Sequence, residues 1–429
     1  MLKSFVYSWL AYWALALIVP VHSIYPSVFD AFALQLVFVF LVCAGYLGTK
    51  AILLNPRMPD METGLIVGVR KIVRYSIYLS LIGLLFLIYD KVVIQGIDYS
   101  MGLAVAREEW RVLGEEREGN ISSVWSAVGY LVGSSYYVTL VVMLTQPNRF
   151  SSGERLGIGF ASFLFCLANS VITGGRSNFM LLAMVAISAL SARRDLSLKR
   201  IFRSRRQRYT VVMGLIFAAI YIIYVFYSRA QASEKSVYLY VADFLPYMGL
   251  EFDDWYSRLL GDDWASTIGN MAILIIGYLT HSLATFAAIV DASPENKIII
   301  FNNAANILYK IGLISMPESD WFLAGRFPSF PGALWHQFGA IGFFLGALSL
   351  GGVAGVCMAW AARSFTRLMP LGMYVMVGST LILSPYLFAP DFLSFPFVLS
   401  AFVLLAVVGR LGSRKHDNTK PTVLRLPAS

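Results

Sequence analysis

The chain has 429 residues, of which 58% are hydrophobic and only 14% are charged, and its mean hydropathy is +0.67. Soluble domains carry about 25% charged residues, so this composition excludes an ordinary soluble fold. The net charge of +9 fits the basic loops of a membrane protein, and we expect no nucleic-acid partner.

The hydrophobic residues are gathered in uncharged runs long enough to cross a bilayer. About 20 apolar residues in a helix span the roughly 30 Å of hydrocarbon, and the short alternating strands of an outer-membrane barrel are absent. We therefore predict an all-α polytopic integral membrane protein with roughly 10–12 transmembrane helices. The predicted spans are 5–24, 29–50, 72–94, 122–145, 157–172, 176–191, 209–228, 333–361, 369–389 and 391–410.

The positions of the cations predict the topology, because Lys and Arg gather on the cytoplasmic side of membrane proteins. The densest basic cluster lies in the loop 192–208, and the C-terminal tail is also basic. The loops 91–122 and 229–269 are rich in Asp and Glu instead. We expect both termini in the cytoplasm and the acidic loops outside, with membrane lipids around the spans.

This topology divides the chain into three parts. Residues 1–228 form a bundle of about seven helices. Residues 229–331 form an outward-facing region that begins and ends outside, and residues 332–429 form a three-helix segment with a cytoplasmic tail. The apolar stretch 270–290 enters the membrane, so the chain must come back to the outside before residue 331. Either 298–314 crosses a second time, or the two pieces form a re-entrant hairpin covered by protein or lining a wet cavity.

Two glycines, an arginine and a serine follow Thr173 between two closely spaced apolar runs. Gly174 and Gly175 permit the unusual backbone angles of a tight turn. Arg176 and Ser177 then open the next helix, whose N-terminus favours an anion, and the arginine fork suits phosphate oxygens. The alternative is an interfacial arginine that reaches toward lipid headgroups.

Two further arginines lie at predicted outer ends of spans. Arg229 ends the seventh span, and Arg326 precedes the span that begins near residue 333. The tendency of cations to lie inside does not explain these three outward arginines, whereas a bound anion would. We therefore expect Arg176, Arg229 and Arg326 to converge in one outward-opening cavity.

A histidine follows in the same region. His336 should lie near the outer leaflet, as a general base, a hydrogen-bond donor or a residue of helix packing. Gly339, Gly342 and Gly346 have the small-residue spacing of close helix contacts. The stretch 104–116 is typical of a short interfacial helix. No cofactor and no metal are expected, since Cys43, Cys166 and Cys357 lie in apolar runs and the four histidines are scattered.

The chain resembles the O-antigen polymerase (Wzy-type) family, which makes bacterial surface polysaccharide. Three passages carry the resemblance. They are Thr173-Gly174-Gly175-Arg176-Ser177, Tyr227-Ser228-Arg229, and Pro328-Ser329-Phe330-Pro331-Gly332 running into Phe338-Gly339-Ala340-Ile341-Gly342. The related O-antigen ligases place a histidine about eleven residues before the glycine equivalent to Gly339, where this chain has Pro328.

The resemblance implies a metal-independent glycosyltransferase in the bacterial inner membrane, with its active site facing the periplasm. Such polymerases join undecaprenyl-diphosphate-linked oligosaccharides, which serve as donor and acceptor, and a chain-length regulator is a possible partner. Arg176, Arg229, Arg326 and His336 would be catalytic. Gly174, Gly175, Ser177 and Ser329 would bind substrate. The alternatives are an O-antigen ligase and a polysaccharide flippase or transporter.

Overall fold

The structure is a computed structural model. It describes residues 1–53, 68–116, 123–173, 177–192, 205–233, 235–257, 264–292, 302, 305, 308–309, 313–315, 327–363, 367–391 and 394–417.

The first half of the described chain contains helices and one short strand. They are α1 (Leu2–Ile18), β1 (Val21–Ser23), α2 (Val28–Leu53), α3 (Val69–Ile88), the π-helix η2 (Tyr89–Ile94), η3 (Tyr99–Met101), α4 (Leu103–Glu116), α5 (Val124–Gly133), α6 (Ser135–Thr145), η4 (Pro147–Arg149), α7 (Ser152–Thr173) and α8 (Ser177–Ala192).

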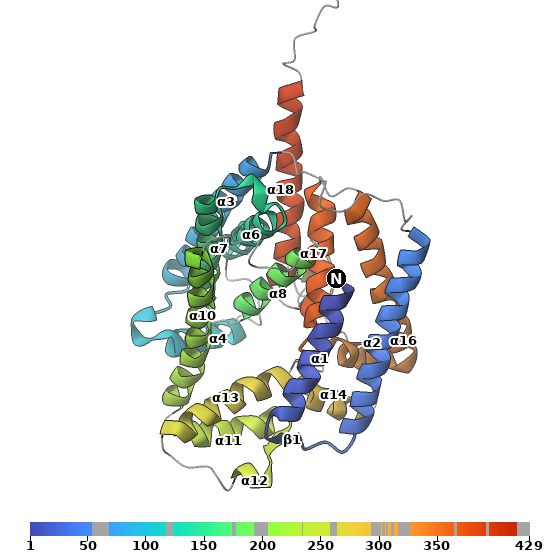
Figure 1. Cartoon of the computed structure of the whole chain (residues 1–429). Helices are drawn as coiled ribbons and strands as arrows, with labels where there is room; N and C mark the ends of the chain where they lie inside the picture. Colours follow the sequence, from blue (N-terminus) through green and yellow to red (C-terminus); the bar gives the residue numbers. More distant parts are fainter. Residues whose placement is uncertain are drawn as a thin grey trace, which may run out of the picture.

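The second half continues the same architecture (Figure 1). Its elements are α10 (Arg205–Ala232), α11 (Val237–Tyr247), β2 (Leu250–Phe252), α12 (Asp254–Ser257), α13 (Trp264–Thr280), α14 (Ser282–Asp291), α16 (Phe330–Arg363), α17 (Leu368–Leu383), η5 (Ala389–Asp391) and α18 (Ser394–Asp417).

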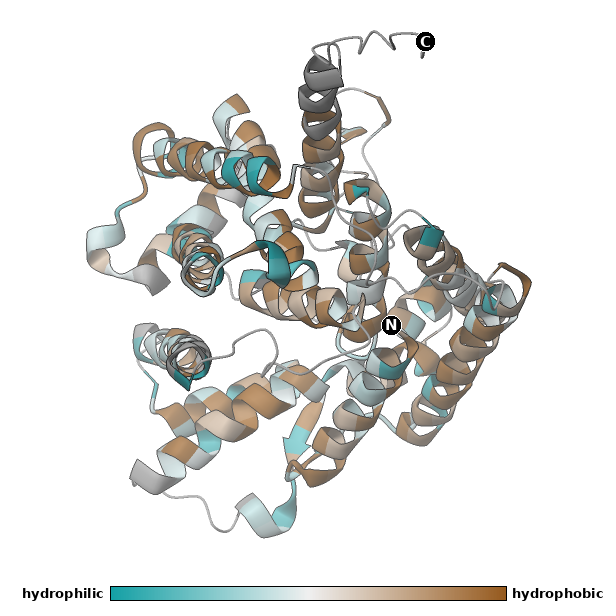
Figure 2. Cartoon of the chain, turned by 45° about the horizontal axis from the view of Figure 1, so that its top comes forward, coloured by the Kyte–Doolittle hydropathy of each residue, from teal (hydrophilic) through white to brown (hydrophobic). Residues whose placement is uncertain are grey.

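Within the described residues, six helices or joined helices are long and apolar enough to cross a membrane. They are α2, α3 with η2, α5 with α6, α7, most of α10, and α16. The pair α13 and α14, bent by 48°, adds a seventh, and shorter apolar helices lie within α1, α8, α17 and α18. Hydrophobic residues run along most of these helices (Figure 2). The chain is an all-α polytopic membrane protein, as its composition predicts.

Glycines bring two pairs of helices into backbone contact. A Cβ added to Gly45 of α2 would lie 2.3 Å from the carbonyl oxygen of Leu348 in α16. One added to Gly351 of α16 would lie 2.2 Å from the carbonyl oxygen of Val42, so neither position accepts a side chain. A Cβ added to Gly83 of α3 would likewise lie 2.3 Å from the Cα of Gly133 in α5. Such contacts are typical of helices that associate within a bilayer.

The structure divides the span that the sequence predicts over 333–361. Gly339 has φ 63° and ψ −163°, so α16 consists of a short leg, Phe330–Phe338, and a long leg that begins at Ala340. The short leg folds back on the long one, because a Cβ on Gly342 would lie 1.9 Å from the Cβ of Phe338 and one on Gly346 would lie 2.8 Å from Leu334. The prediction of a single continuous helix was therefore wrong, because the hydrophobic pattern does not reveal this reversal.

Contacts between helix ends define two opposite faces of the bundle. On the first, Arg70 of α3 pairs with Glu154 of α7 at 3.5 Å, and Arg363 donates a hydrogen bond of 2.7 Å to the carbonyl of Leu53. We call this the basic face. All four residues belong to ends that the sequence assigns to the cytoplasm.

The opposite face carries the short antiparallel sheet. Here β1, which follows α1, pairs with β2 from the acidic region, so that His22 lies opposite Glu251. We call this sheet-bearing face the acidic face. The α7 helix begins on the basic face and runs 22 residues, roughly 33 Å, away from it. The strand β2 belongs to the loop 229–269 that the sequence assigns to the outside. The predicted span 5–24 was wrong at its end, because α1 stops at Ile18 and residues 21–23 form β1.

Candidate functional site

Most of the residues predicted to act on substrate lie outside the described residues. This holds for Gly174, Gly175, Arg176 and Arg326, while Ser177 and Arg229 are described only as helix backbone. The described residues show only that α7 ends at Thr173 and that α8 begins at Ser177. The convergence of the three arginines stays a prediction, but their described neighbours show which elements surround these segments.

A tyrosine fixes the end of α7, directly before the glycine turn. The Tyr99 hydroxyl in η3 donates a hydrogen bond of 2.7 Å to the carbonyl of Ile172. Burial, followed by the nearby charges of Asp90 and Glu109, raises the pKa of Tyr99 to about 12. The phenol therefore remains a donor at any physiological pH. This bond joins the segment 99–116 to the approach to Arg176.

A buried cluster at the end of α3 supports the same segment. Asp90 lies in the π-helix η2 and is fully buried, and it accepts hydrogen bonds from Gln95 at 2.5 Å and from Ser123 at 2.6 Å. The Lys91 ammonium lies 3.8 Å from the Asp90 carboxylate and 4.6 Å from the centre of the Trp110 ring in α4. This cation–π contact attaches α4 to the bundle.

The α4 helix carries a partly buried arginine toward three other helices. Ala106 on its inner side is buried, whereas Val105 is exposed. The guanidinium of Arg107 interacts electrostatically with Tyr278 in α13, with the neighbouring carboxylate of Glu108, and with Tyr221 in α10 and Tyr240 in α11. Burial lowers the pKa of Arg107 from its usual value, while these groups act in the opposite direction. The arginine remains charged in this setting.

The break between α13 and α14 places a histidine beside the segment that follows Arg326. His281 is 3% exposed, and its Nδ1 lies 2.7 Å from the carbonyl of Tyr278. Its Nε2 lies 3.2 Å from the backbone N–H of Phe327. The apolar stretch 270–290 is thus a bent helix pair. Residues 298–314 lie largely outside the described residues, so the second crossing and the re-entrant hairpin both stay predictions.

Aromatic ring contacts connect this histidine to α10 and to Phe327. The ring centres of Tyr278 and His281 lie 5.5 Å apart, and those of His281 and Phe327 lie 6.4 Å apart. Phe226, in the last part of α10, lies 5.9 Å from Tyr278. Tyr278 therefore contacts Phe226, which precedes Arg229, and is linked through His281 to Phe327, which follows Arg326.

Ser329 and His336 lie at the start of α16. Ser329 is fully buried and its hydroxyl accepts a hydrogen bond of 3.3 Å from the N–H of Gly332, so it caps the short leg. The N–H of Phe330 donates to the carbonyl of Ser384 at the end of α17. His336 is 1% exposed and lies in the short leg instead of the membrane span that the sequence predicts. Both residues thus belong to a packed structural unit, and their action on substrate stays a prediction.

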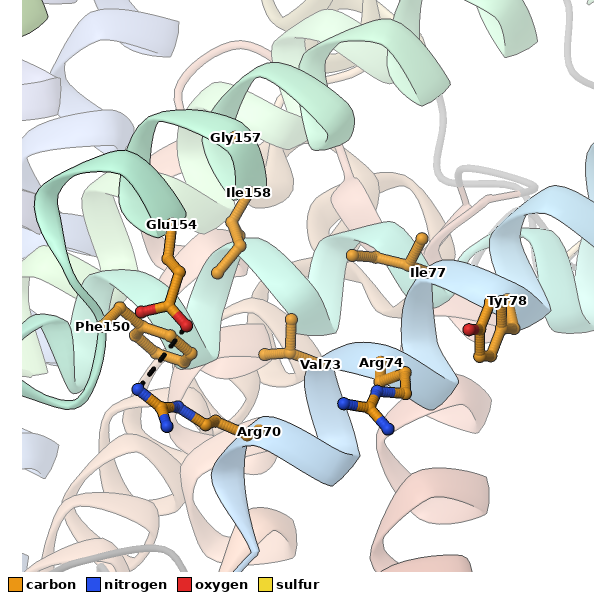
Figure 3. Close-up of a pocket in the computed structure, with 9 residues that line it drawn as sticks. All are labelled: Arg70, Val73, Arg74, Ile77, Tyr78, Phe150, Glu154, Gly157 and Ile158. Carbon is orange, nitrogen blue, oxygen red and sulfur yellow. Dashed lines mark ion pairs between the residues drawn. The ribbon is translucent and has the colours of Figure 1, made fainter.

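A groove of about 400 Å³ opens on the basic face (Figure 3). Arg70 and Arg74 of α3 line it together with Glu154 of α7, and the Arg70–Glu154 ion pair closes one end. The groove lies at the end of α7 opposite to the Tyr99–Ile172 contact. It is therefore separate from the candidate site.

Comparisons with protein-family models, with curated proteins and with solved structures give no match for this chain. The candidate site therefore rests on its own geometry. Sequence reasoning placed Arg107 on an interfacial helix but did not include it, or the three tyrosines, in the site. The one available signal was an arginine in a short helix within an otherwise acidic loop.

Proposed function

We propose that this protein is a glycosyltransferase that polymerises undecaprenyl-diphosphate-linked oligosaccharide units at the periplasmic face of the inner membrane. One observation carries the proposal. The residues beside Arg229 and Arg326 are linked through Tyr278 and His281. The end of α7 before Arg176 bonds to Tyr99, and α4, which follows Tyr99, packs against α10. These contacts support a common site for the three arginines.

The chemistry of the transfer explains why cations are needed there. A hydroxyl of the acceptor sugar forms a new glycosidic bond to the anomeric carbon of the donor, and the bond from that carbon to the diphosphate breaks. The hydroxyl proton passes to a base, and the electron pair of the broken bond leaves with the lipid diphosphate. Fixed guanidinium groups that hold this growing negative charge lower the barrier.

A transporter or flippase is the second candidate, favoured by one specific observation. The 48° bend between α13 and α14 at His281 resembles the interrupted helices that form substrate sites in transporters. The ligase alternative is less well supported, because Pro328 occupies the place of the ligase histidine. The arginines at predicted outer span ends favour an enzyme over a transporter.

Deletion of the gene in its host, followed by a polysaccharide gel, tests the proposal. A polymerase defect removes the ladder of long chains but leaves a single repeat unit on its acceptor. Loss of every unit would indicate the ligase or the flippase, and an unchanged ladder would overturn all three. Expression of the intact chain in the deletion strain should restore the ladder.

A further inference from the structure

The groove on the basic face lies between two helices that both begin there. The α3 and α7 helices form its two walls, and its volume is about 400 Å³ (Figure 3). Its charged lining residues are Arg70, Arg74 and Glu154. Its apolar lining includes Ile77 of α3 and Ile158 of α7. The groove therefore combines a charged part with an apolar part.

The groove becomes apolar with distance from the basic face. On α3, Arg70, Arg74 and Tyr78 follow one another at intervals of four residues, so they occupy one face of the helix. Tyr78 lies roughly 12 Å further along the axis than Arg70. On α7, Ile158 lies one turn beyond Glu154. Because both helices are candidate membrane spans, the apolar part lies on the side of the hydrocarbon.

The charged part carries more positive than negative charge. Arg70 pairs with Glu154 at 3.5 Å. Glu154 is itself fixed, because its carboxylate accepts a hydrogen bond of 2.6 Å from the N–H of Ser151, whose hydroxyl accepts one from the N–H of Glu154. Arg74 is exposed and forms no ion pair with the described part of the chain. Its guanidinium can therefore take an anionic partner.

We propose that this groove binds an anionic phospholipid of the surrounding membrane. The phosphate lies beside Arg70 and Arg74, whose forks suit its oxygens, and an acyl chain follows Ile77 and Ile158 toward the hydrocarbon. The excess of positive charge favours a headgroup with net negative charge over phosphatidylcholine. The site is separate from the proposed glycosyltransferase site, and it does not depend on that function.

The shape of the groove favours a lipid over a soluble anion. An inorganic phosphate would use the charged part alone, whereas a phospholipid also covers the apolar part. The α7 wall leaves room for a chain, because a Cβ added to Gly157 would meet no atom within 4 Å. The sequence assigns this face to the cytoplasm, and basic pockets between transmembrane helices on that side are typical headgroup sites.

Binding of phosphatidylglycerol to the purified full chain in detergent, measured by native mass spectrometry, tests the proposal. We expect Arg74→Ala to weaken binding about tenfold or more. Lys71→Ala is its control, because Lys71 is an exposed cation of the same helix end that does not line the groove. Phosphatidylcholine should bind more weakly than phosphatidylglycerol, and inorganic phosphate should not displace the lipid.

A second pair of variants changes the shape of the groove without changing its charge. Gly157→Leu places a side chain in the groove and should also weaken binding about tenfold. Gly153→Leu is its control, because a Cβ at Gly153 likewise meets no atom within 4 Å and that residue does not line the groove. The melting temperature of each variant without added lipid shows whether it is folded.

Several outcomes would overturn the inference. Equal weakening by Arg74→Ala and Lys71→Ala would indicate a general attraction of the basic face for anionic lipid. Unchanged binding by folded Gly157→Leu would place the lipid outside the groove, and this variant decides the matter if Arg74→Ala does not fold. Displacement by inorganic phosphate would indicate a site for free anions. None of these results depends on the gene-deletion test of the proposed function.

Discussion

The Nε2 atom of His281 accepts a hydrogen bond from the backbone N–H of Phe327, at 3.2 Å and across 46 residues of sequence. The other ring nitrogen lies 2.7 Å from the carbonyl of Tyr278 and must donate to it. These partners assign the neutral imidazole with its proton on Nδ1. The histidine thereby ties the segment after Arg326 to the end of α13.

His281→Ala should therefore reduce polymerisation, because it releases the residues next to Arg326. The lost hydrogen bond is worth about 0.5–1.5 kcal/mol. His281→Gln retains an acceptor at a similar reach and should preserve more of the ladder than alanine does. Polysaccharide gels at matched expression measure the difference. Equal ladders from the alanine variant and the unsubstituted chain would contradict this role.

Tyr99→Phe should weaken the attachment of η3 to the end of α7. The substitution removes the hydroxyl bonded to Ile172 and keeps the ring, so we expect a loss of about 0.5–1.5 kcal/mol at that contact. The ladder should become shorter or fainter, with an unchanged amount of protein in the membrane. Tyr75→Phe is the control, because Tyr75 is exposed on α3. If both variants behave alike, the bond to Ile172 has no functional role.

Gly339→Ala should disturb the reversal of α16. The combination of φ 63° and ψ −163° is accessible essentially only to glycine, so a side chain there costs about 1–3 kcal/mol. We expect a lower melting temperature in detergent and reduced activity. Gly48→Ala serves as the control, since a Cβ at that helical position meets no atom within 4 Å. A Gly339→Ala variant as stable as the parent would show that the reversal tolerates a side chain.

Arg176 should matter through the geometry of its guanidinium as well as through its charge. Lysine keeps the charge but loses the planar two-point fit to phosphate oxygens. A charged hydrogen bond is worth about 1.5–3 kcal/mol, so its loss slows the reaction roughly tenfold or more. Arg176→Lys should impair the ladder and Arg176→Ala should impair it further. If Arg176→Lys gives a normal ladder, the arginine contacts lipid headgroups and not the substrate.

Reporter fusions test the sidedness on which the proposed function depends. A fusion at residue 200 should report the cytoplasm, and one at residue 255 should report the periplasm, because Lys and Arg gather inside. The structure joins β1 to β2 on one face, so a fusion after residue 24 should match the one at 255. A fusion at residue 200 that reports the periplasm would overturn the topology.

Local sequence patterns were sufficient to locate most of the helices. The predicted span 29–50 corresponds to α2, 157–172 to α7, and the predicted short helix 104–116 to α4. Hydropathy and composition are properties of neighbouring residues, and a span or a short amphipathic helix depends on little else. The boundaries therefore agree closely for these elements.

The reversal at Gly339 and the group around Arg107 depend on contacts between distant residues. Both legs of α16 are hydrophobic, and only the packing of Phe338 and Leu334 over glycines reveals that the chain turns back. Likewise, Tyr221, Tyr240 and Tyr278 are ordinary helix residues in sequence, and they become neighbours of Arg107 only because four helices meet. Periodicity alone contains no such information.

The backbone contact between α2 and α16 also has a consequence for biosynthesis. The bonded residues Leu53 and Arg363 are 310 positions apart. At about 5–20 residues per second of synthesis, α2 waits roughly 15–60 s in the bilayer before its partner exists. During that time its glycine surface is open to lipid or to insertion factors. Ribosome stalling or truncation before residue 330 would leave this surface exposed, which makes α2 a natural place for quality control of the unfinished chain.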